Sequence, residues 1–391
     1  MDLRREIKLS DLVPKRPART PRSQPKKLHE RNRRAAGAEI VGLKIGATAV
    51  TAAQVENNGG KRVVRLARQA LAPGVVDSGE VRDPIALGHA LAELFKAHQL
   101  PRRGVRLGIA NSRIGVRVIE VAGVEDERQL ENAIAFRAHE MLSVPQEEAV
   151  LDYHVLSSQT NGDGATARKI LLVVAYRDSV DRYLDAAEVA GIEVSGIDLE
   201  AFALLRAVAA PGSPVDEGVS ATAVTAVNVG HERTVLAISN GEVCEFARVL
   251  QWGGSALGQA IARALKVSSA EGESLKRGLS LEHGDEGAEG LSAADAAEAV
   301  EAVRYELSTL VRELLSSLRF YQSQPDSLAI GEILLTGGTS AIPGLAAELE
   351  RELGIGVRVC DPLARVQLAE GVQPPDPPGA VTVAVGLGIE D

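Results

Sequence analysis

Two similar glycine hairpins, one early in each half of the chain, restrict the possible fold more than any other feature. The first reads GLKIGATAV and the second reads VNVGHERTVLAI. Gly46 and Gly230 lie 184 positions apart, and at this offset Lys44 aligns with Asn228. In both copies a short β-rich run meets a glycine turn, and a second apolar run follows. The repeat predicts a duplicated architecture with two related lobes, and the alternative is two unrelated hairpins that look alike.

The composition fits a chain that builds more than one core from aliphatic side chains. The 391 residues are 45% hydrophobic and only 3% aromatic, which suits two lobes packed with Leu, Val, Ile and Ala. The longest apolar runs, ILLVVAY from Ile170 and AVTVAVGLGI from Ala380, predict buried strands. Both are shorter than the roughly 20 residues of a membrane span, and we expect no secretory signal in the charged N-terminal segment. The two cysteines fit a reducing cytosol.

Strand and helix patterns alternate along the chain, which predicts an α/β fold. Helical periodicity runs through PIALGHALAELFKAH (84–98) and EDERQLENAIAFRAHEML (125–142). Near the C-terminus, EILLTGGTSAIPGLAAELERELG is typical of a strand, a glycine turn and a helix.

Positive charge is concentrated at the N-terminus. Residues 1–38 contain twelve Lys and Arg against four Asp and Glu, a balance of +8, so the net charge of −10 leaves −18 for the rest of the chain. A basic tail on an acidic body can contact anionic lipid, contact nucleic acid or fold back on its own body. We favour lipid contact, at about 1 kcal/mol for each basic residue near the surface, and expect no specific nucleic acid.

Four glycine turns offer backbone N–H groups that can form a concave anion site. The turns comprise Gly46, Ala47 and Thr48; Gly230, His231 and Glu232; Gly253 and Gly254; and Gly337, Gly338 and Thr339. One glycine turn is weak evidence. Two matched hairpins together with a strand–turn–helix segment predict a cleft between two lobes, in which the turns surround a phosphate chain.

These segments together resemble the actin-like ATPase superfamily, and most closely the PilM family, the FtsA-like cytosolic component of type IV pilus and related secretion machines. The two hairpins are similar to the phosphate hairpins of the family, IDLEAFALLRA to its connecting segment, and LLTGGTSAIPGLAAELERELG to its adenosine-site segment. GESLKRG resembles the nucleotide-base helix, with Glu273 and Lys276 at its Glu and Lys. The resemblance runs from about Ile40 to the C-terminus. It implies ATP or ADP as the ligand.

The resemblance also implies the domain organisation. The expected fold is a duplicated ribonuclease-H-like fold, with two lobes around a nucleotide cleft and an inserted subdomain of the FtsA and PilM type. We expect a flexible basic tail over 1–38, a first lobe over 39–210 and a second lobe over 211–391. The inserted subdomain is expected at about 105–190, and a smaller subdomain of the second lobe at about 256–328.

The chain departs from the family pattern at the acidic position of each hairpin. The family normally carries an Asp two residues before each hairpin glycine, and the two acids organise a hydrated Mg²⁺ against the phosphates. Here these positions hold Lys44 and Asn228, which makes a Mg²⁺ site doubtful because Mg²⁺ requires oxygen ligands in near-octahedral geometry. We expect Lys44 to contact phosphate oxygens directly. The alternative is an empty cleft in which Lys44 extends to water.

Glu200, in IDLEAF, is the remaining candidate catalytic residue, because hydrolysis needs a group that orients water. The alternative is a solvent-facing carboxylate at a helix start, where the helix dipole stabilises it. Since phosphoryl transfer requires metal, positioning and a water-orienting group together, we expect weak or no ATP hydrolysis.

The function that the resemblance implies is a cytoplasmic nucleotide-binding scaffold at the inner face of the cell membrane, in a type IV pilus or related secretion platform. The expected partners are a PilN-like membrane protein and a pilus motor. REIKLSDLVPKRP resembles the PilN segment that docks on PilM, with Ile7, Leu9 and Leu12 as anchors, and chance similarity is the alternative. The alternative functions are an active FtsA-like ATPase that forms polymers and a sugar-kinase-like enzyme.

Overall fold

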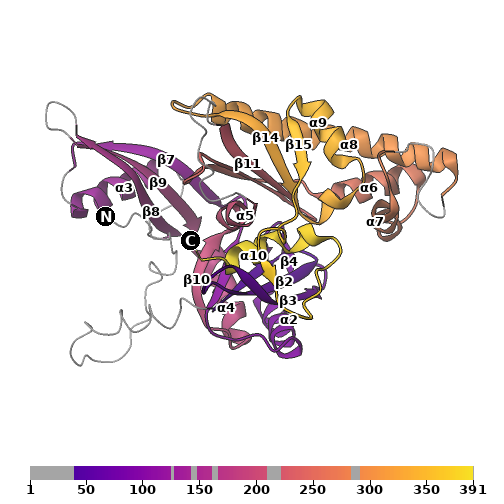
Figure 1. The fold of residues 1–391 in the computed structure, drawn as a ribbon, viewed down its shortest axis with the longest axis horizontal. Helices are drawn as coiled ribbons and strands as arrows, with labels where there is room; N and C mark the ends of the chain where they lie inside the picture. The colour runs from indigo at the N-terminus through magenta and orange to yellow at the C-terminus, as the bar shows by residue number, and fades with distance from the viewer. Residues whose placement is uncertain are drawn as a thin grey trace.

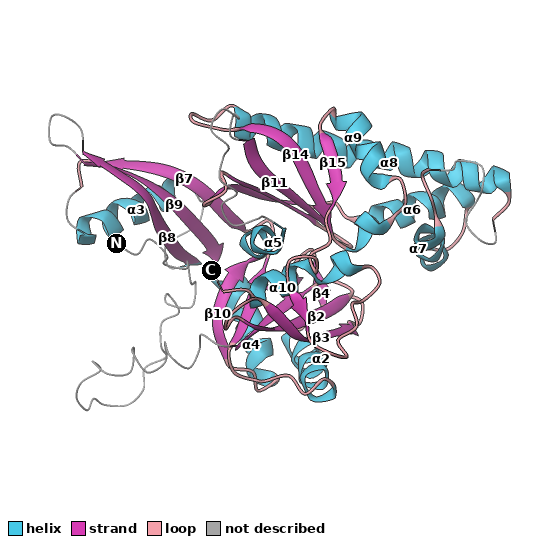
Figure 2. Cartoon of the chain, viewed as in Figure 1, coloured by secondary structure: helices cyan, strands magenta, loops and turns pink. Residues whose placement is uncertain are grey.

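The structure is a computed structural model that describes residues 39–124, 127–141, 148–160, 166–208, 222–282 and 291–390. These ranges form two large sheets, a third sheet of three strands and a two-stranded hairpin, β4 (Val76–Asp77) with β5 (Glu80–Val81). Figures 1 and 2 show the third sheet projecting to one side of the two large sheets, with helices on and between them.

The first large sheet has six strands in the order β10-β6-β1-β2-β3-β16. The strands are β1 Glu39–Ile45, β2 Ala49–Glu56, β3 Arg62–Ala70, β6 Val105–Ile109, β10 Val194–Leu199 and β16 Gln367–Leu368. The first predicted hairpin is β1 with β2, which pair antiparallel, and β1 pairs parallel with β6 on its other side.

The second large sheet has five strands in the order β13-β12-β11-β14-β15. The strands are β11 Thr222–Val229, β12 Thr234–Ser239, β13 Cys244–Leu250, β14 Ala329–Thr336 and β15 Gly356–Val359. Its pairing directions repeat those of β3-β2-β1-β6-β10: two antiparallel pairs, then two parallel pairs. This repeat confirms the predicted duplicated α/β architecture.

Helices cover the outer face of each large sheet. The described helices are α2 Pro84–Ala97, α3 Glu127–Met141, α4 Arg177–Val189, α5 Glu200–Val208, α6 Gly254–Leu265, α7 Ser269–Gly278, α8 Ala293–Gln322, α9 Leu345–Leu353 and α10 Thr382–Gly388, with 3-10 turns η3 Gly338–Ala341 and η4 Pro378–Val381. One core joins β1 with α2 and α4, and another joins β11 with α6, α8 and α9. Each large sheet therefore buries apolar surface, at about 25 cal/mol per Å², within its own lobe.

Two helices, α5 and α10, lie between the large sheets near the centre of Figure 1. They pack against each other, and α10 also contacts β1 and β2. The core around α5 joins Leu204 to Ala226 and Val235 of the second sheet, so α5 bridges the lobes. The strand predicted from Ala380 is wrong, because this segment forms the end of η4 and then α10, which is buried throughout. A helix enclosed on all sides has no polar face, so its sequence cannot be distinguished from a buried strand.

The third sheet has the order β7-β9-β8 and belongs to an insertion in the first lobe. Its strands are β7 Ile114–Ala122, β8 Ala149–Thr160 and β9 Thr166–Tyr176, and α3 packs on it through Leu130 and Ile134. The chain enters from β6 and returns through α4, and both of these elements pack in the first lobe. The subdomain limits of 105–190 and the other predicted domain limits stay predictions.

Local sequence signals set several helix starts. Asp83 caps α2 by accepting hydrogen bonds from the N–H groups of Ile85 and Ala86, as the predicted helix over 84–98 requires. Ser268 and Glu271 form a capping box at the start of α7.

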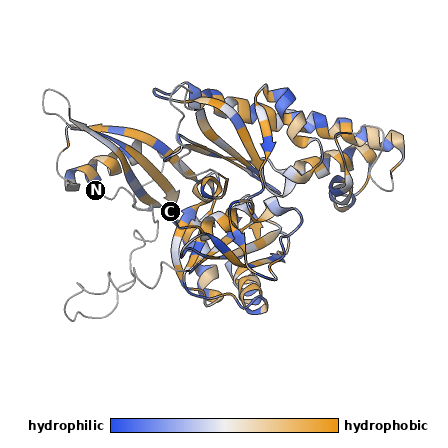
Figure 3. Ribbon diagram, in the orientation of Figure 1, coloured by the Kyte–Doolittle hydropathy of each residue, from blue (hydrophilic) through white to orange (hydrophobic). Residues whose placement is uncertain are grey.

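Figure 3 shows the strands of the large sheets mostly hydrophobic, while α8 mixes hydrophobic and hydrophilic residues. None of the helices in the described ranges has the length and apolar composition of a membrane span.

Candidate nucleotide site between the two lobes

Both glycine hairpins close in the same way. The Gly46 N–H donates to the Ala49 carbonyl at 2.9 Å, and the Gly230 N–H donates to the Arg233 carbonyl at 3.0 Å. Among the described residues, the two N–H groups that follow each glycine donate no hydrogen bond to the protein. Successive free N–H groups in a tight turn are the donors of a backbone anion site, so both turns keep this capacity.

Two further predicted segments hold the turn of the second hairpin. The Gly254 N–H at the start of α6 donates to the Gly230 carbonyl at 2.9 Å, and Thr339 Oγ1 donates to the same carbonyl at 3.1 Å. Because the Gly254 N–H is used in this contact, it is not free to bind a phosphate. The turn at Gly253 and Gly254 therefore supports the hairpin, and its contact with nucleotide stays a prediction.

The last glycine turn lies directly against β11. Gly337 has a φ of +100°, and a Cβ at this position would lie 2.3 Å from the Val229 carbonyl oxygen, so only glycine fits. Gly338 then begins η3, which places Thr339 beside the second hairpin.

The predicted nucleotide-base helix, α7, is fixed beside the same hairpin. Lys276 Nζ donates to the Gly254 carbonyl at 2.9 Å and to both carboxylate oxygens of Glu273 at 2.8 Å. Burial lowers the pKa of Lys276, and the Glu273 carboxylate partly offsets this effect. Glu273 Oε1 also lies 3.9 Å from Nδ1 of His231, in the hairpin turn. These contacts assemble four predicted segments of the second lobe at one place: the second hairpin, the turn at Gly253 and Gly254, the turn before Thr339, and α7. Contact with a base stays a prediction.

Lys44 and Asn228 occupy equivalent places on β1 and β11, and both face the helices between the sheets. Side chains alternate along a strand, so Lys44 shares its face with Gly42. A Cβ at Gly42 would lie 2.1 Å from the Ala384 carbonyl oxygen of α10, which shows that this face meets α10. Asn228 shares its face with Ala226, which belongs to the core around α5.

Neither polar group has its bonding capacity filled by the protein. Lys44 is half-buried, and its amine has no hydrogen-bond or ion-pair partner among the described residues. Burial lowers the pKa of Lys44, Glu200 opposes the shift, and Arg233 and Arg68 add to it. The side chain of Asn228 is 2% exposed, and its Oδ1 lacks a partner in the described part of the chain. A buried polar group without a partner is unfavourable, so both residues favour an added polar ligand.

Glu200 is buried, and its carboxylate is already paired. It begins α5 with 1% exposure, and its Oε1 accepts a hydrogen bond from Arg233 Nη2 at 2.8 Å. The alternative of a solvent-facing carboxylate is therefore wrong, because α5 lies between the two sheets. Its role in orienting water stays a prediction.

Arg233 is the residue of this junction that sequence reasoning missed. It directly precedes β12 in the turn of the second hairpin, is 6% exposed, and contacts the Ile45 carbonyl of the first lobe. Burial works against its charge, but the Glu200 carboxylate raises the pKa of Arg233 above its usual value. The available signal was a charged residue directly before the apolar run TVLAI. An arginine buried at the start of such a strand requires an acidic partner, and this requirement could have drawn attention to Arg233.

The residues at this junction do not fit a magnesium site. Lys44 and Asn228 stand where two acids are expected, and Glu200 is engaged by Arg233. Two cations beside one carboxylate repel a divalent cation. Within the ranges that the structure covers, no group of three or more His, Cys, Asp or Glu side chains is placed to hold a metal ion.

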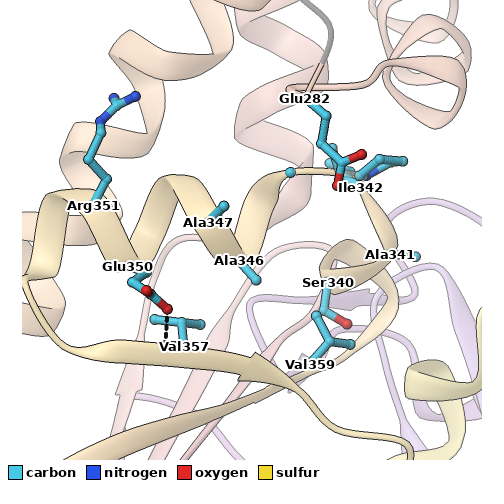
Figure 4. Close-up of a pocket in the computed structure, with 12 residues that line it drawn as sticks. Glu282, Ser340, Ala341, Ile342, Ala346, Ala347, Glu350, Arg351, Val357 and Val359 are labelled. Carbon is cyan, nitrogen blue, oxygen red and sulfur yellow. Dashed lines mark hydrogen bonds between the residues drawn. The ribbon is translucent and has the colours of Figure 1, made fainter.

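A separate cavity of about 680 Å³ lies beside α9, outside the junction of the hairpins (Figure 4). Its lining includes Ser340, Ile342 and Ala346, and it contains none of the predicted site residues. At the edge of the cavity, Glu350 Oε2 accepts a hydrogen bond from the Val357 N–H at 2.9 Å, as Figure 4 shows. The cavity therefore adds nothing to the candidate nucleotide site.

The model of the family described as the type IV pilus assembly protein PilM matches residues 42–390, from β1 to the end of the described chain. The chain belongs to the PilM family. The match includes both glycine hairpins, the inserted third sheet and α10. The predicted resemblance to PilM is thereby confirmed.

Individual relatives agree with the PilM assignment. A solved PilM–PilN type IV pilus biogenesis complex is 25% identical, with a TM-score of 0.74, and the match covers 90% of this chain and 98% of that chain. Cell division protein FtsA of Bacillus subtilis (strain 168) is 24% identical over 315 residues, which cover 73% of this chain and 70% of FtsA. MreB5 of Spiroplasma citri, solved with ADP, is 13% identical with a TM-score of 0.51, and covers 90% of this chain and 95% of its own. The predicted actin-like, FtsA-related fold is confirmed.

The predicted tail anchors of this PilM-family chain lie outside the described residues. Ile7, Leu9 and Leu12 belong to the segment before Glu39, so their role stays a prediction.

Proposed function

We propose that this chain is a cytoplasmic scaffold of a type IV pilus or related secretion platform, peripheral to the inner face of the cell membrane, and that it binds ATP or ADP. The observation that carries the proposal is the PilM family match over residues 42–390. The solved PilM–PilN complex supports a PilN-like membrane protein as the partner. The basic tail adds an electrostatic contact with anionic lipid, and a pilus motor is the further partner.

The proposed nucleotide site lies between the two glycine hairpins. The MreB5 relative, which shares the fold and was solved with ADP, supports a nucleotide as the ligand. The free N–H groups after Gly46 and Gly230 would bind phosphate oxygens. The unpaired amine of Lys44 would add a charge-assisted hydrogen bond in the place of the metal.

We further propose that hydrolysis is weak or absent. Phosphoryl transfer depends on a metal, on positioning and on a group that orients water. The residues present do not fit a magnesium site, and the Glu200 carboxylate is held by Arg233. A nucleotide would therefore act as a ligand that fixes the lobes and would not be turned over.

The first prediction concerns metal-free binding of ATP. Calorimetric titration of the full chain with ATP should give the same affinity with magnesium and with a chelator, because Lys44 replaces the metal. Lys44→Asp should lose more than about tenfold of the metal-free affinity, since hydrogen bonds to charged groups contribute about 1.5–3 kcal/mol. It should regain part of this affinity when magnesium is added, because an acid then stands at the metal position.

Lys96→Asp is the matched control, because it makes the same change of charge at an exposed position on α2. It should leave ATP binding unchanged. Binding by the unchanged protein only in the presence of magnesium would contradict the proposal that lysine stands in for the metal. An absence of ATP binding under every condition would leave a scaffold that acts through its protein contacts alone.

The second candidate function is an active FtsA-like ATPase that forms polymers, which the match to FtsA over 315 residues favours. Light scattering with ATP and magnesium distinguishes the two functions. A scaffold should show no nucleotide-dependent rise in scattering and should capture a PilN-like cytosolic peptide. A rise that needs ATP, with release of phosphate, would instead support the polymer-forming ATPase.

A further inference from the structure

Two charged side chains fasten the turn of the second hairpin to the first lobe. Glu232 Oε2 accepts a hydrogen bond from the Ser78 N–H at 2.8 Å. Arg233 Nη2 donates to the Ile45 carbonyl at 3.2 Å and to Glu200 Oε1 at 2.8 Å. Ile45 is the last residue of β1, so Arg233 contacts the first hairpin directly before its glycine turn. We refer to Arg233, Glu200 and Glu232 as the interlobe clamp.

A tight turn of the first lobe, between β4 and β5, packs against the side chain of Arg233. Ser78 and Gly79 join β4 to β5, and both have positive φ, which is the pattern of a type I′ turn. The Tyr183 hydroxyl donates to the Gly79 carbonyl at 2.7 Å. Burial raises the pKa of Tyr183 to about 12, so this hydroxyl keeps its proton at neutral pH. A Cβ at Gly79 would lie 2.8 Å from Arg233 Nη1, so the guanidinium packs against bare backbone.

One carboxylate at this junction faces two cations. Glu200 pairs with Arg233, and their side chains are 1% and 7% exposed. Lys44 pairs in register with Gly108 on the adjacent strand, and Glu200 Cγ lies 3.5 Å from the place of a Cβ on Gly108, so the same carboxylate lies beside Lys44. Two other acids near the junction already have partners: Glu232 accepts a hydrogen bond from the Ser78 N–H, and Asp198 pairs with Arg206. Because a buried charge without a partner is unfavourable, the junction favours an added anion.

We infer that Arg233 exchanges partners when an anion binds, releasing Glu200 and binding the phosphate oxygens that Lys44 attracts. The inference rests on the proposed function, because the same two hairpins bind the anion. A guanidinium binds phosphate in a bidentate geometry, whereas it contacts one carboxylate oxygen of Glu200 here. Glu200 then competes with the anion for the Arg233 guanidinium and so limits the affinity for the anion. When Arg233 moves from Glu200 to the anion, the contact between the lobes changes.

The exchange predicts that removing the competitor tightens anion binding. Calorimetric titration of the full chain with inorganic pyrophosphate, in the presence of a chelator, should give about tenfold higher affinity for Glu200→Gln than for the unchanged protein. Asp198→Asn is the matched control. Asp198 forms a buried ion pair with Arg206 within the first lobe, so this change removes the same charge nearby without touching Arg233. It should leave the affinity unchanged.

A double variant tests whether the gain comes through Arg233. Glu200→Gln with Arg233→Gln keeps two hydrogen-bonding amides and removes the cation, so its pyrophosphate affinity should fall below that of the unchanged protein. If Glu200→Gln does not fold, Glu200→Asp retracts the same charge by one methylene and should shift the affinity in the same direction. Equal or weaker binding by the Glu200 variant, pyrophosphate binding by none of the proteins, or a double variant that binds as tightly as the single one would each overturn the inference.

ATP titration of the same proteins separates this inference from the proposed function. If the unchanged protein binds ATP without metal and Glu200→Gln binds no more tightly, the partner exchange fails and the proposed function stands. If Glu200→Gln tightens pyrophosphate binding but ATP binds only with magnesium, the metal-free site fails and the partner exchange stands.

Discussion

Replacing Arg233 by methionine should lower the free energy of unfolding by about 3–5 kcal/mol, because it leaves a buried carboxylate without a partner. Glu200 is 1% exposed, so its carboxylate has little contact with solvent when Arg233 is in place. The substitution also removes the hydrogen bond to the Ile45 carbonyl, at the edge of the other lobe. Denaturant unfolding followed by circular dichroism measures the loss.

Two control variants show whether the loss arises from the buried charge. Arg233→Met combined with Glu200→Leu removes both charges, and most of the stability should return because apolar residues often replace a buried pair without loss. Arg62→Met breaks an exposed pair with Glu56 and should cost less than about 1 kcal/mol. A loss of only this size for Arg233→Met would mean that the interlobe clamp is open to solvent and does not join the lobes.

The duplication of the fold could be predicted because its signals are local. A glycine turn between two β-rich runs defines each hairpin, and the strand alternation then fixes the direction of Lys44 and Asn228. Asp83 and Pro84 likewise set the start of α2 in the sequence itself. These features depend on neighbours within a few residues, so the chain carries them before it folds.

The features that escaped prediction depend on residues far apart in the chain. Arg233 meets Glu200 across 33 positions and two lobes, and no spacing rule connects them. The Gly254 N–H donates to the Gly230 carbonyl. From the sequence alone, the N–H groups of this glycine turn are expected to be free to bind an anion. The sequence of α10 lacks a polar face because the two sheets enclose it, so its helical form follows from its surroundings.

Arg233 also changes how the two substituted acids are understood. Loss of both hairpin acids alone predicts a weaker metal site. With Arg233 beside Lys44, the junction instead carries two cations against the Glu200 carboxylate, which is the charge pattern of a site for an anion. Lys44 and Asn228 in place of the two acids, together with the buried Arg233, thus favour an anion over a metal ion at this junction. These residues lie at independent positions on both lobes.

Replacing Gly386 by alanine should destabilise the protein by about 1–3 kcal/mol or more, because it overpacks the contact between α5 and α10. A Cβ at this position would lie 1.8 Å from the Ala203 carbonyl oxygen and 2.6 Å from the carbonyl carbon. These are backbone atoms of α5, so no side-chain rotation relieves the overlap and the helices must separate. Since α5 carries Glu200 and α10 lies under the face of β1 that carries Lys44, ATP affinity should fall as well.

Gly115→Ala is the control for this prediction, because a Cβ at Gly115 on β7 meets nothing within 4 Å. It should stay within about 0.5 kcal/mol of the unchanged protein in denaturant unfolding. If Gly386→Ala also stays within this range, the two inner helices are not in close contact in solution, and the spacing of Lys44 and Glu200 cannot depend on them. If it unfolds more easily and binds ATP less tightly while the control does neither, the helix contact between the sheets sets the geometry of the nucleotide site.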